Sequence, residues 1–160
     1  MQRTQQADGS WTPLWFGNQE RADEANPIYG TGKVLLALRD LNQSDSPAAQ
    51  KGMAWLVQSQ NDDGGWGGDC RNDEGLLRSS LEETAVAVEA LFSADPSPEI
   101  ANARNRGLTW LIEKVEQGQP LQPSPIGLYF AKLWYFERLY PLIFADSCLR
   151  RAAQRVNDGS

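Results

Sequence analysis

The sequence repeats a short pattern at a fixed spacing of 55 residues. The segment Lys51–Leu56 matches Arg106–Leu111, because both read as a basic residue, glycine, two variable residues, tryptophan and leucine. A Gly-x-Trp triplet ends at Trp11 and again at Trp66, with the same separation. A shared register of this kind predicts a supersecondary unit that recurs along the chain, each copy burying one face against the next.

Apolar residues recur every three or four positions, which is typical of amphipathic helices. Ser46 with Pro47, and Ser80 with Glu83, have the spacing of helix starts. We therefore predict an all-α chain after an opening loop, with short or glycine-rich connections that suit stacked helical hairpins. The six predicted helices cover residues 31–41, 47–59, 80–94, 99–115, 127–139 and 141–156.

The composition of the chain excludes several kinds of catalytic and metal-binding site. The chain has no histidine, so it cannot supply a Ser-His-Asp triad, a Cys-His pair or a histidine-ligated zinc. Cys70 and Cys148 are far apart with no CxxC, so we predict no metal site, and we predict no cofactor. The net charge of -6 argues against a nucleic-acid partner. No long apolar run or signal-peptide pattern is present, and we expect an intracellular protein.

The repeat resembles the QW motif of triterpene cyclases, a family that includes the squalene-hopene and oxidosqualene cyclases. The segment Lys51–Trp66 has the full motif, in which Gln60 is followed by Gly-x-Trp. Gln6–Trp11 is similar to the back half of another copy, whose front half we expect before Met1. A third copy at 106–115 is degenerate, because Val115 replaces the expected glutamine.

Further segments resemble the carboxy-terminal part of bacterial squalene-hopene cyclases in the same order. They are Tyr29–Gly32, Gly64–Arg71, Ser79–Leu91 and Tyr129–Pro141. The resemblance implies that residues 1–160 form an incomplete squalene cyclase C-terminal-type domain, a fragment of an α/α barrel. Within it, residues 1–30 are an opening loop with the truncated motif, 51–66 the full motif and 106–115 the degenerate one.

The tryptophans of these motifs are interpreted as structural clamps and not as pocket-lining residues. A glutamine amide can bond unpaired backbone groups at the end of one helix, while an indole face covers the start of the next. The predicted clamp residues are Gln6, Trp11, Trp55, Gln60, Trp66 and Trp110.

The resemblance implies cyclisation of squalene or a related linear isoprenoid, begun by proton transfer and continued through carbocations. Family members take the proton from an aspartate in a DxDD motif, which this sequence lacks. Asp62 and Asp63 are the nearest carboxylate pair, but we expect them to be exposed in a glycine turn. No catalytic residue is therefore assigned, and the chain is expected to be inactive alone because an open cavity admits water.

Aromatic ring faces are the groups that stabilise carbocations in this chemistry. By resemblance, Trp15 and Tyr29 match cavity-lining positions. Tyr129, Leu133 and Phe136 stand at i, i+4 and i+7 of a predicted helix, with Leu133 in place of an aromatic. Aromatic residues lie nearly all round that predicted helix, so core packing is the alternative interpretation.

The implied partners are an isoprenoid substrate and the remaining barrel half, or a separate cyclase chain. Two alternatives stay open: a non-catalytic helical module that completes a split cyclase, and a prenyltransferase-like barrel that binds a polyprenyl lipid. The family also implies peripheral association with the cytoplasmic membrane. Arg150, Arg151 and Arg155 could meet anionic headgroups there, or could simply be a solvated helix end.

Overall fold

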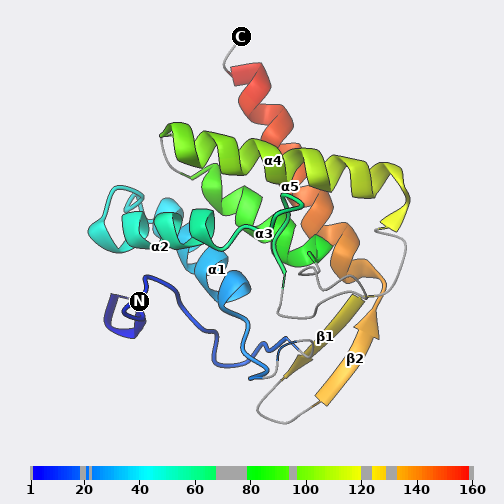
Figure 1. Ribbon diagram of the computed structural model, residues 1–160, viewed down its shortest axis with the longest axis horizontal. Coiled ribbons are helices and arrows are strands. Elements are labelled where there is room, and N and C mark those ends of the chain that lie inside the picture. The colour runs from blue at the N-terminus through cyan, green and yellow to red at the C-terminus, as the bar shows by residue number, and fades with distance from the viewer. Residues whose placement is uncertain are drawn as a thin grey trace.

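The computed structural model describes residues 2–18, 21, 23–67, 79–93, 97–119, 124–128 and 133–158. Within these residues the chain forms five α-helices, a short 3-10 helix and one β-hairpin (Figure 1). In chain order they are η1 (Gln2–Thr4), α1 (Pro27–Asp40), α2 (Pro47–Gln58), α3 (Leu81–Leu91), α4 (Pro98–Glu116), β1 (Ser124–Leu128), β2 (Leu133–Glu137) and α5 (Leu139–Asp158).

Side-chain caps fix where four of the helices begin. In each case an asparagine or serine side chain accepts a hydrogen bond from a backbone N–H in the first turn, which satisfies one of the free donors there. Three of these helices also have proline in their first turn, where its missing N–H costs nothing. The capping residues are Asn26, Ser46, Ser80 and Ser97. Because Asn26 and Pro27 form such a start, α1 begins four residues earlier than predicted.

The predicted helix at 127–139 is wrong, because its described residues 127–128 and 133–137 belong to two antiparallel strands. Ile126 pairs with Tyr135 and Leu128 with Leu133. The run of large apolar and aromatic residues at 133–136 favours an extended chain. Leu133 and Phe136 consequently share no helix face, and the described residues hold five α-helices where six were predicted.

The helices are arranged in two layers. The first layer, here called the core layer, has α3 between α1 and α5. The second, the cover layer, consists of α2 and α4, which contact each other and pack on α1 and α3 respectively. Figure 1 shows the hairpin at one edge of the helices and the end of α5 extending past them. Among the described residues no helix is long and apolar enough to cross a membrane.

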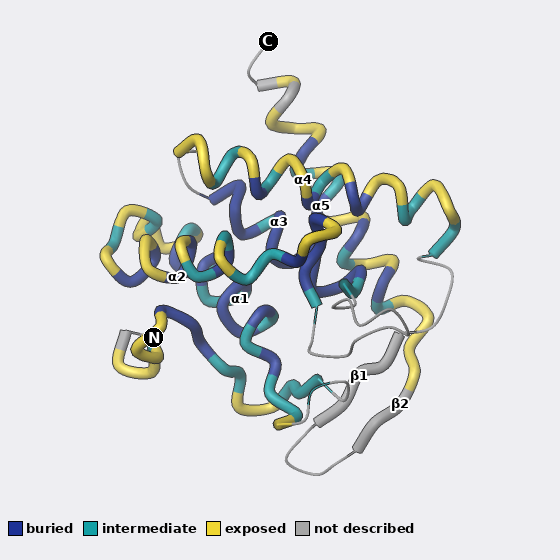
Figure 2. Tube along the Cα trace, in the orientation of Figure 1, coloured by how far each residue is buried: buried dark blue, intermediate teal, exposed yellow. Residues whose placement is uncertain are grey.

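Helix α3 is the centre of the hydrophobic core. Ten of its eleven residues are buried, whereas α2 and α4 keep one side exposed (Figure 2). Contacts between α3 and α5 follow the same order along both helices. Ser147 donates to Glu89, and Arg155, further along α5, donates to the carbonyl of Phe92 just after α3. Helices α3 and α5 therefore run in the same direction.

Two buried indoles separate the layers in the same way at each repeat. A β-carbon placed on Gly107 of α4 would lie 2.5 Å from Cζ3 of Trp66 and 2.6 Å from a methyl group of Val88. On Gly52 of α2 it would lie 2.8 Å from Cζ3 of Trp11. The glycine of each basic-Gly pair is thus required because the indole passes directly over the helix backbone.

We predict that Gly107→Ala lowers the free energy of unfolding by about 1 to 3 kcal/mol, because the added methyl group overlaps Trp66 and Val88. The sign of this change is informative, because alanine in a helix is otherwise more stable than glycine by about 1 kcal/mol. Urea unfolding followed by tryptophan fluorescence measures the change. Asn105→Ala, on the exposed side of the same helix, is the control and should be neutral or slightly stabilising. A stabilised Gly107→Ala protein would contradict the packing described here.

Candidate functional site

The glutamine of the full motif joins two helical hairpins through backbone carbonyls. The Nε2 atom of Gln60 donates to the oxygens of Gly64, at 2.7 Å, and Ala103, at 2.8 Å. Its Oε1 atom accepts from Arg106, which also donates to the carbonyls of Asn61 and Asp62. The turn after α2 is thereby fastened to α4 by the glutamine and by the basic residue of the next repeat.

In the first copy, Gln5 and not Gln6 makes the equivalent bonds. The Nε2 atom of Gln5 donates to the oxygens of Gly9 and Ala48, at 2.9 Å each. Gln6 is exposed, and its amide donates to the hydroxyl of Thr12. The prediction of Gln6 was wrong by one position. The 55-residue spacing from Gln60 leads to Gln5, and this signal was available in the sequence.

The motif tryptophans are held by hydrogen bonds as well as by packing. Trp66 is fully buried, and its Nε1 atom donates to the carbonyl of Leu56 at 2.8 Å. The backbone N–H of Trp66 donates to Thr84, and that of Trp11 donates to Thr31, each at 2.9 Å. Trp11 and Trp110 are buried and Trp55 is partly buried.

The turn carboxylates are exposed, as predicted, and they bind donors of the turn. Asp63 accepts from the N–H of Gly65 at 3.0 Å and from Nε1 of Trp110 at 3.0 Å. Asp8 has the matching position in the first copy. The backbone N–H of Ser10 holds the pKa of Asp8 below its ordinary value. At neutral pH the Asp8 carboxyl group has therefore already lost its proton and has none to donate to a substrate.

Four aromatic side chains gather near the starts of α1 and α5, and we call them the aromatic cluster: Phe16, Tyr29, Tyr140 and Phe144. The ring centroids of Phe16 and Tyr29 are 5.3 Å apart, those of Tyr29 and Phe144 6.2 Å, and those of Tyr140 and Phe144 4.8 Å. These are the spacings at which ring edges and faces attract.

A lysine ammonium lies on the aromatic cluster. The Nζ atom of Lys33 is 4.6 Å from the centroid of Phe144 and 5.6 Å from that of Tyr29, within the range of a cation–π interaction. Burial lowers the pKa of Lys33, while the Glu89 carboxylate acts in the opposite direction. The ring faces of the cluster therefore already accommodate a positive charge that has lost part of its water.

The tyrosines of the aromatic cluster are kept neutral. Burial raises the pKa of Tyr29. It also raises that of Tyr140, where the charges of Tyr29, Glu82 and Glu83 act in the same direction. Glu83 is engaged elsewhere, since it accepts from Ser80 at 2.8 Å and from Asn18 at 3.2 Å. The ring faces of the cluster can stabilise a cation, while its tyrosine hydroxyls stay protonated.

Of the five predicted cavity residues, one lies in the aromatic cluster. That residue is Tyr29. Trp15 is 58% exposed and Phe136 is 64% exposed. Leu133 lies in β2, but its side chain falls outside the described residues, as do Tyr129 and residues 68–71 of the matched segment Gly64–Arg71. Of the three predicted cavity side chains that the structure describes, only Tyr29 belongs to the aromatic cluster.

Sequence reasoning missed the residues that meet Tyr29. Lys33 follows Tyr29 by four positions on α1, and Phe144 follows Tyr140 by four positions on α5. Each pair can be recognised as one helix face. Phe16, however, comes from the opening loop, and only the fold shows that the three segments meet. Among the described residues no group of histidine, cysteine and acidic side chains could hold a metal ion.

Two of the three arginines considered for lipid headgroups have partners on the protein. Arg150 binds the Asp146 carboxylate at 2.7 Å, and Arg155 donates to the carbonyl of Phe92 at 2.9 Å. The bond from Arg155 ties the last turns of α5 to the end of α3.

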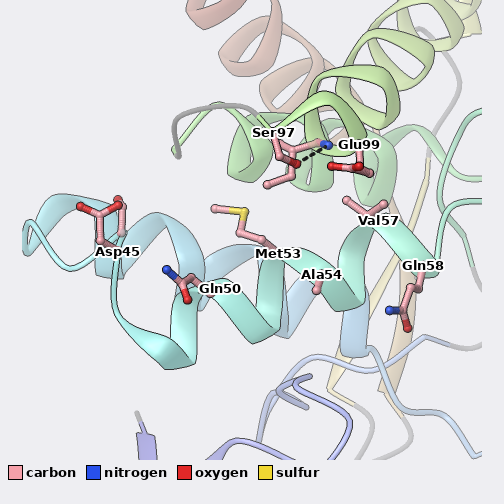
Figure 3. Close-up of a pocket in the computed structure, with 10 residues that line it drawn as sticks. Asp45, Gln50, Met53, Ala54, Val57, Gln58, Ser97 and Glu99 are labelled. Carbon is pink, nitrogen blue, oxygen red and sulfur yellow. Dashed lines mark hydrogen bonds between the residues drawn. The ribbon is translucent and has the colours of Figure 1, made fainter.

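A groove of about 580 Å³ lies between α2 and the start of α4. Figure 3 shows Met53 and Val57 of α2 facing the first turn of α4, with Asp45 and Glu99 at the sides. None of the predicted cavity residues and none of the aromatic cluster lines it. The groove is thus separate from the aromatic site, on the cover layer.

Comparison with known proteins gives one family over almost the whole chain. Residues 1–153 match the model of the squalene-hopene cyclase C-terminal domain. A probable squalene–hopene cyclase from Sinorhizobium fredii is 41% identical over 155 residues, which are 89% of this chain. A squalene–hopene cyclase from Zymomonas mobilis is 31% identical over 153 residues, 88% of this chain. The chain spans 22% of the length of each of these relatives.

A solved structure is similar in fold. The ent-copalyl diphosphate synthase from Streptomyces platensis superposes with a TM-score of 0.64 at 22% identity. The match covers 92% of this chain and 25% of the other. The helical layers described above therefore correspond to one part of a larger helical protein.

We predict that Gln5→Ala destabilises the chain by about 1 to 3 kcal/mol, because it removes both bonds to the carbonyls of Gly9 and Ala48. Gln6→Ala is the matched control and should change the free energy of unfolding by no more than about 0.5 kcal/mol. Chemical denaturation of the two variants makes the comparison. Equal losses, or a larger loss for Gln6→Ala, would restore the original prediction.

We predict that Lys33 makes stability depend on pH. Because the folded chain holds this proton less tightly than the unfolded chain, the free energy of unfolding should rise as pH increases towards the ordinary lysine value of 10.5. Lys33→Met should remove that rise, which is expected just below pH 10.5. Lys51→Met, at an exposed lysine, is the control and should keep it. A rise that persists without Lys33 would assign it to another group.

Proposed function

The chain belongs to the squalene-hopene cyclase C-terminal domain family, and from that premise we propose that it supplies the carboxy-terminal part of a cyclase for squalene or a related linear isoprenoid. Its homologues are class II terpene cyclases. The squalene assignment is supported by the Sinorhizobium and Zymomonas relatives, both of which are described as squalene–hopene cyclases.

The observation that carries the proposal is the position of Lys33 on the aromatic cluster. A cation that lies 4.6 Å from the Phe144 centroid uses the interaction that a carbocation intermediate needs. Stabilisation of this kind is strongest where water is excluded, and Lys33 and Tyr29 are both partly buried. We propose that the ring faces of Tyr29 and Phe144 belong to the wall of the cyclisation cavity in the complete enzyme.

The five family-matched positions remain part of this proposal. In the complete enzyme Trp15, Tyr29, Tyr129, Leu133 and Phe136 line the substrate cavity. The exposed rings of Trp15 and Phe136 then become covered by the substrate or by other parts of the barrel. The proton comes from an aspartate outside this chain, because the sequence holds no DxDD and Asp63 is bound within its turn.

A second candidate function is that of a separate module which completes a cyclase encoded on another chain. The observation in its favour is that 89% of this chain aligns with only 22% of the Sinorhizobium relative. Catalysis would then require both chains. The two candidates share the same cavity wall and differ only in how the remaining barrel is supplied.

We predict that the chain alone forms no cyclic product from squalene, whereas a chimera does. In the chimera, this chain replaces the matching segment of the Sinorhizobium fredii relative. Phe136→Ala in the chimera should shift the products to early-terminated cyclic compounds, because a cation would lose the ring face that holds it. Gas chromatography with mass spectrometry identifies the products.

Leu41→Ala is the control for this substitution, because Leu41 is also exposed but lies at the end of α1, outside the proposed wall. It should leave the product pattern unchanged. An unchanged pattern with Phe136→Ala would remove Phe136 from the cavity. Cyclisation by the chain alone would overturn the proposal that its acid lies elsewhere.

A further inference from the structure

Large apolar side chains lie exposed where β2 leads into α5. We call this set the edge stripe: Leu139, Leu142 and Ile143. Leu139 is 63% exposed and Ile143 61% exposed. Single exposed apolar residues are ordinary, but three within five positions form a patch of the kind that marks an interaction surface.

Leu139 and Ile143 of the edge stripe lie on the side of α5 opposite to its core contacts, with Leu142 next to them. Pro141, Ala145, Cys148 and Ala152 are buried and form one helical stripe. At 100° per residue, Leu139 and Ile143 lie about 160° and 200° from Pro141. The same outer side continues with the exposed Asp146–Arg150 ion pair. The free side of α5 is therefore apolar in its first two turns and charged beyond them.

Helix α5 is the last member of a row. Within the described residues, α1 packs on α3 and α3 packs on α5, and the free side of α5 is where a further helix of this row would lie. In layered helical repeats each unit buries its face against the next, and only a terminal unit with a polar outer side is stable in water. The first turns of α5 lack that polar side.

We propose that the edge stripe is the seat of another core-layer helix of the cyclase, supplied by the part of the enzyme that this chain does not contain. This inference rests on the proposed function, and the row α1–α3–α5 is its structural basis. The partner helix presents apolar side chains at a spacing of three and four to Leu139 and Ile143. It is polar where it passes Asp146 and Arg150.

Matched substitutions test the proposal in two contexts, the isolated chain and the chimera with the Sinorhizobium fredii relative. Ile143→Glu changes the edge stripe. Ile112→Glu makes the same exchange on α4 of the cover layer, where the isoleucine is 40% exposed. In the isolated chain, both should shift the melting temperature by less than about 2 °C. In the chimera, Ile143→Glu should lower it by about 5 °C or more, while Ile112→Glu should not.

Three outcomes would overturn the proposal. One is an equal effect of Ile143→Glu in both contexts. Another is a dimer of the isolated chain in analytical ultracentrifugation that Ile143→Glu dissociates, which would make a second copy the occupant. The third is flotation of the chain with phosphatidylcholine and phosphatidylglycerol vesicles that Ile143→Glu abolishes, which would make the occupant a lipid bilayer.

The melting temperature of the chimera tests the docking surface, whereas its products test the proposed function. A chimera that melts as expected but forms no cyclic product would contradict the function and support the docking surface. If the chimera does not fold, co-expression of the chain with the rest of the relative provides the same comparison. The unchanged and Ile112→Glu chains should then be captured with it and Ile143→Glu should not, and failure of the unchanged chain to be captured would overturn the proposal.

Discussion

The close approach of an indole ring to a helix backbone determines how the two layers of this protein meet. Trp66 lies against Gly107, and Trp11 lies against Gly52, at a distance that no β-carbon could share. Each contact places a large apolar surface between a cover helix and the core layer, where α3 is buried on nearly every side. The aromatic cluster lies in the core layer that these contacts cover, where α1 and α5 flank α3.

Much of the fold could be predicted from the sequence, because its determinants are local. Serine caps, prolines in first turns and the period of three to four apolar residues locate α2, α3 and α4. The helix predicted at 127–139 is wrong because aromatic residues at helical spacing also have a strong preference for an extended chain. Whether such a run forms a helix or a strand depends on what it packs against, which one sequence does not contain.

The candidate site was predictable only in part. Tyr29 was found by family resemblance, and its neighbour Lys33 could have been found from helical spacing. The meeting of Phe16, Tyr29 and Phe144 joins the opening loop to two helices more than 100 residues apart in sequence. Such a contact is a property of tertiary packing. For Trp15 and Phe136 the family resemblance predicts a cavity, whereas their rings are exposed on the surface of this chain.

The side-chain amides of Gln5 and Gln60 donate hydrogen bonds only to main-chain atoms. Gln5 and Gln60 each bond two carbonyl oxygens, and a carbonyl is present whichever side chain its residue carries. The hydrogen bonds themselves therefore place no demand on the side chains at the acceptor positions Ala48 and Ala103. A helical hairpin that is held by hydrogen bonds of this kind can be duplicated, and the sequences of its copies can diverge widely. The constant positions would then be few, which fits a family whose members share 41% or 31% of their residues with this chain.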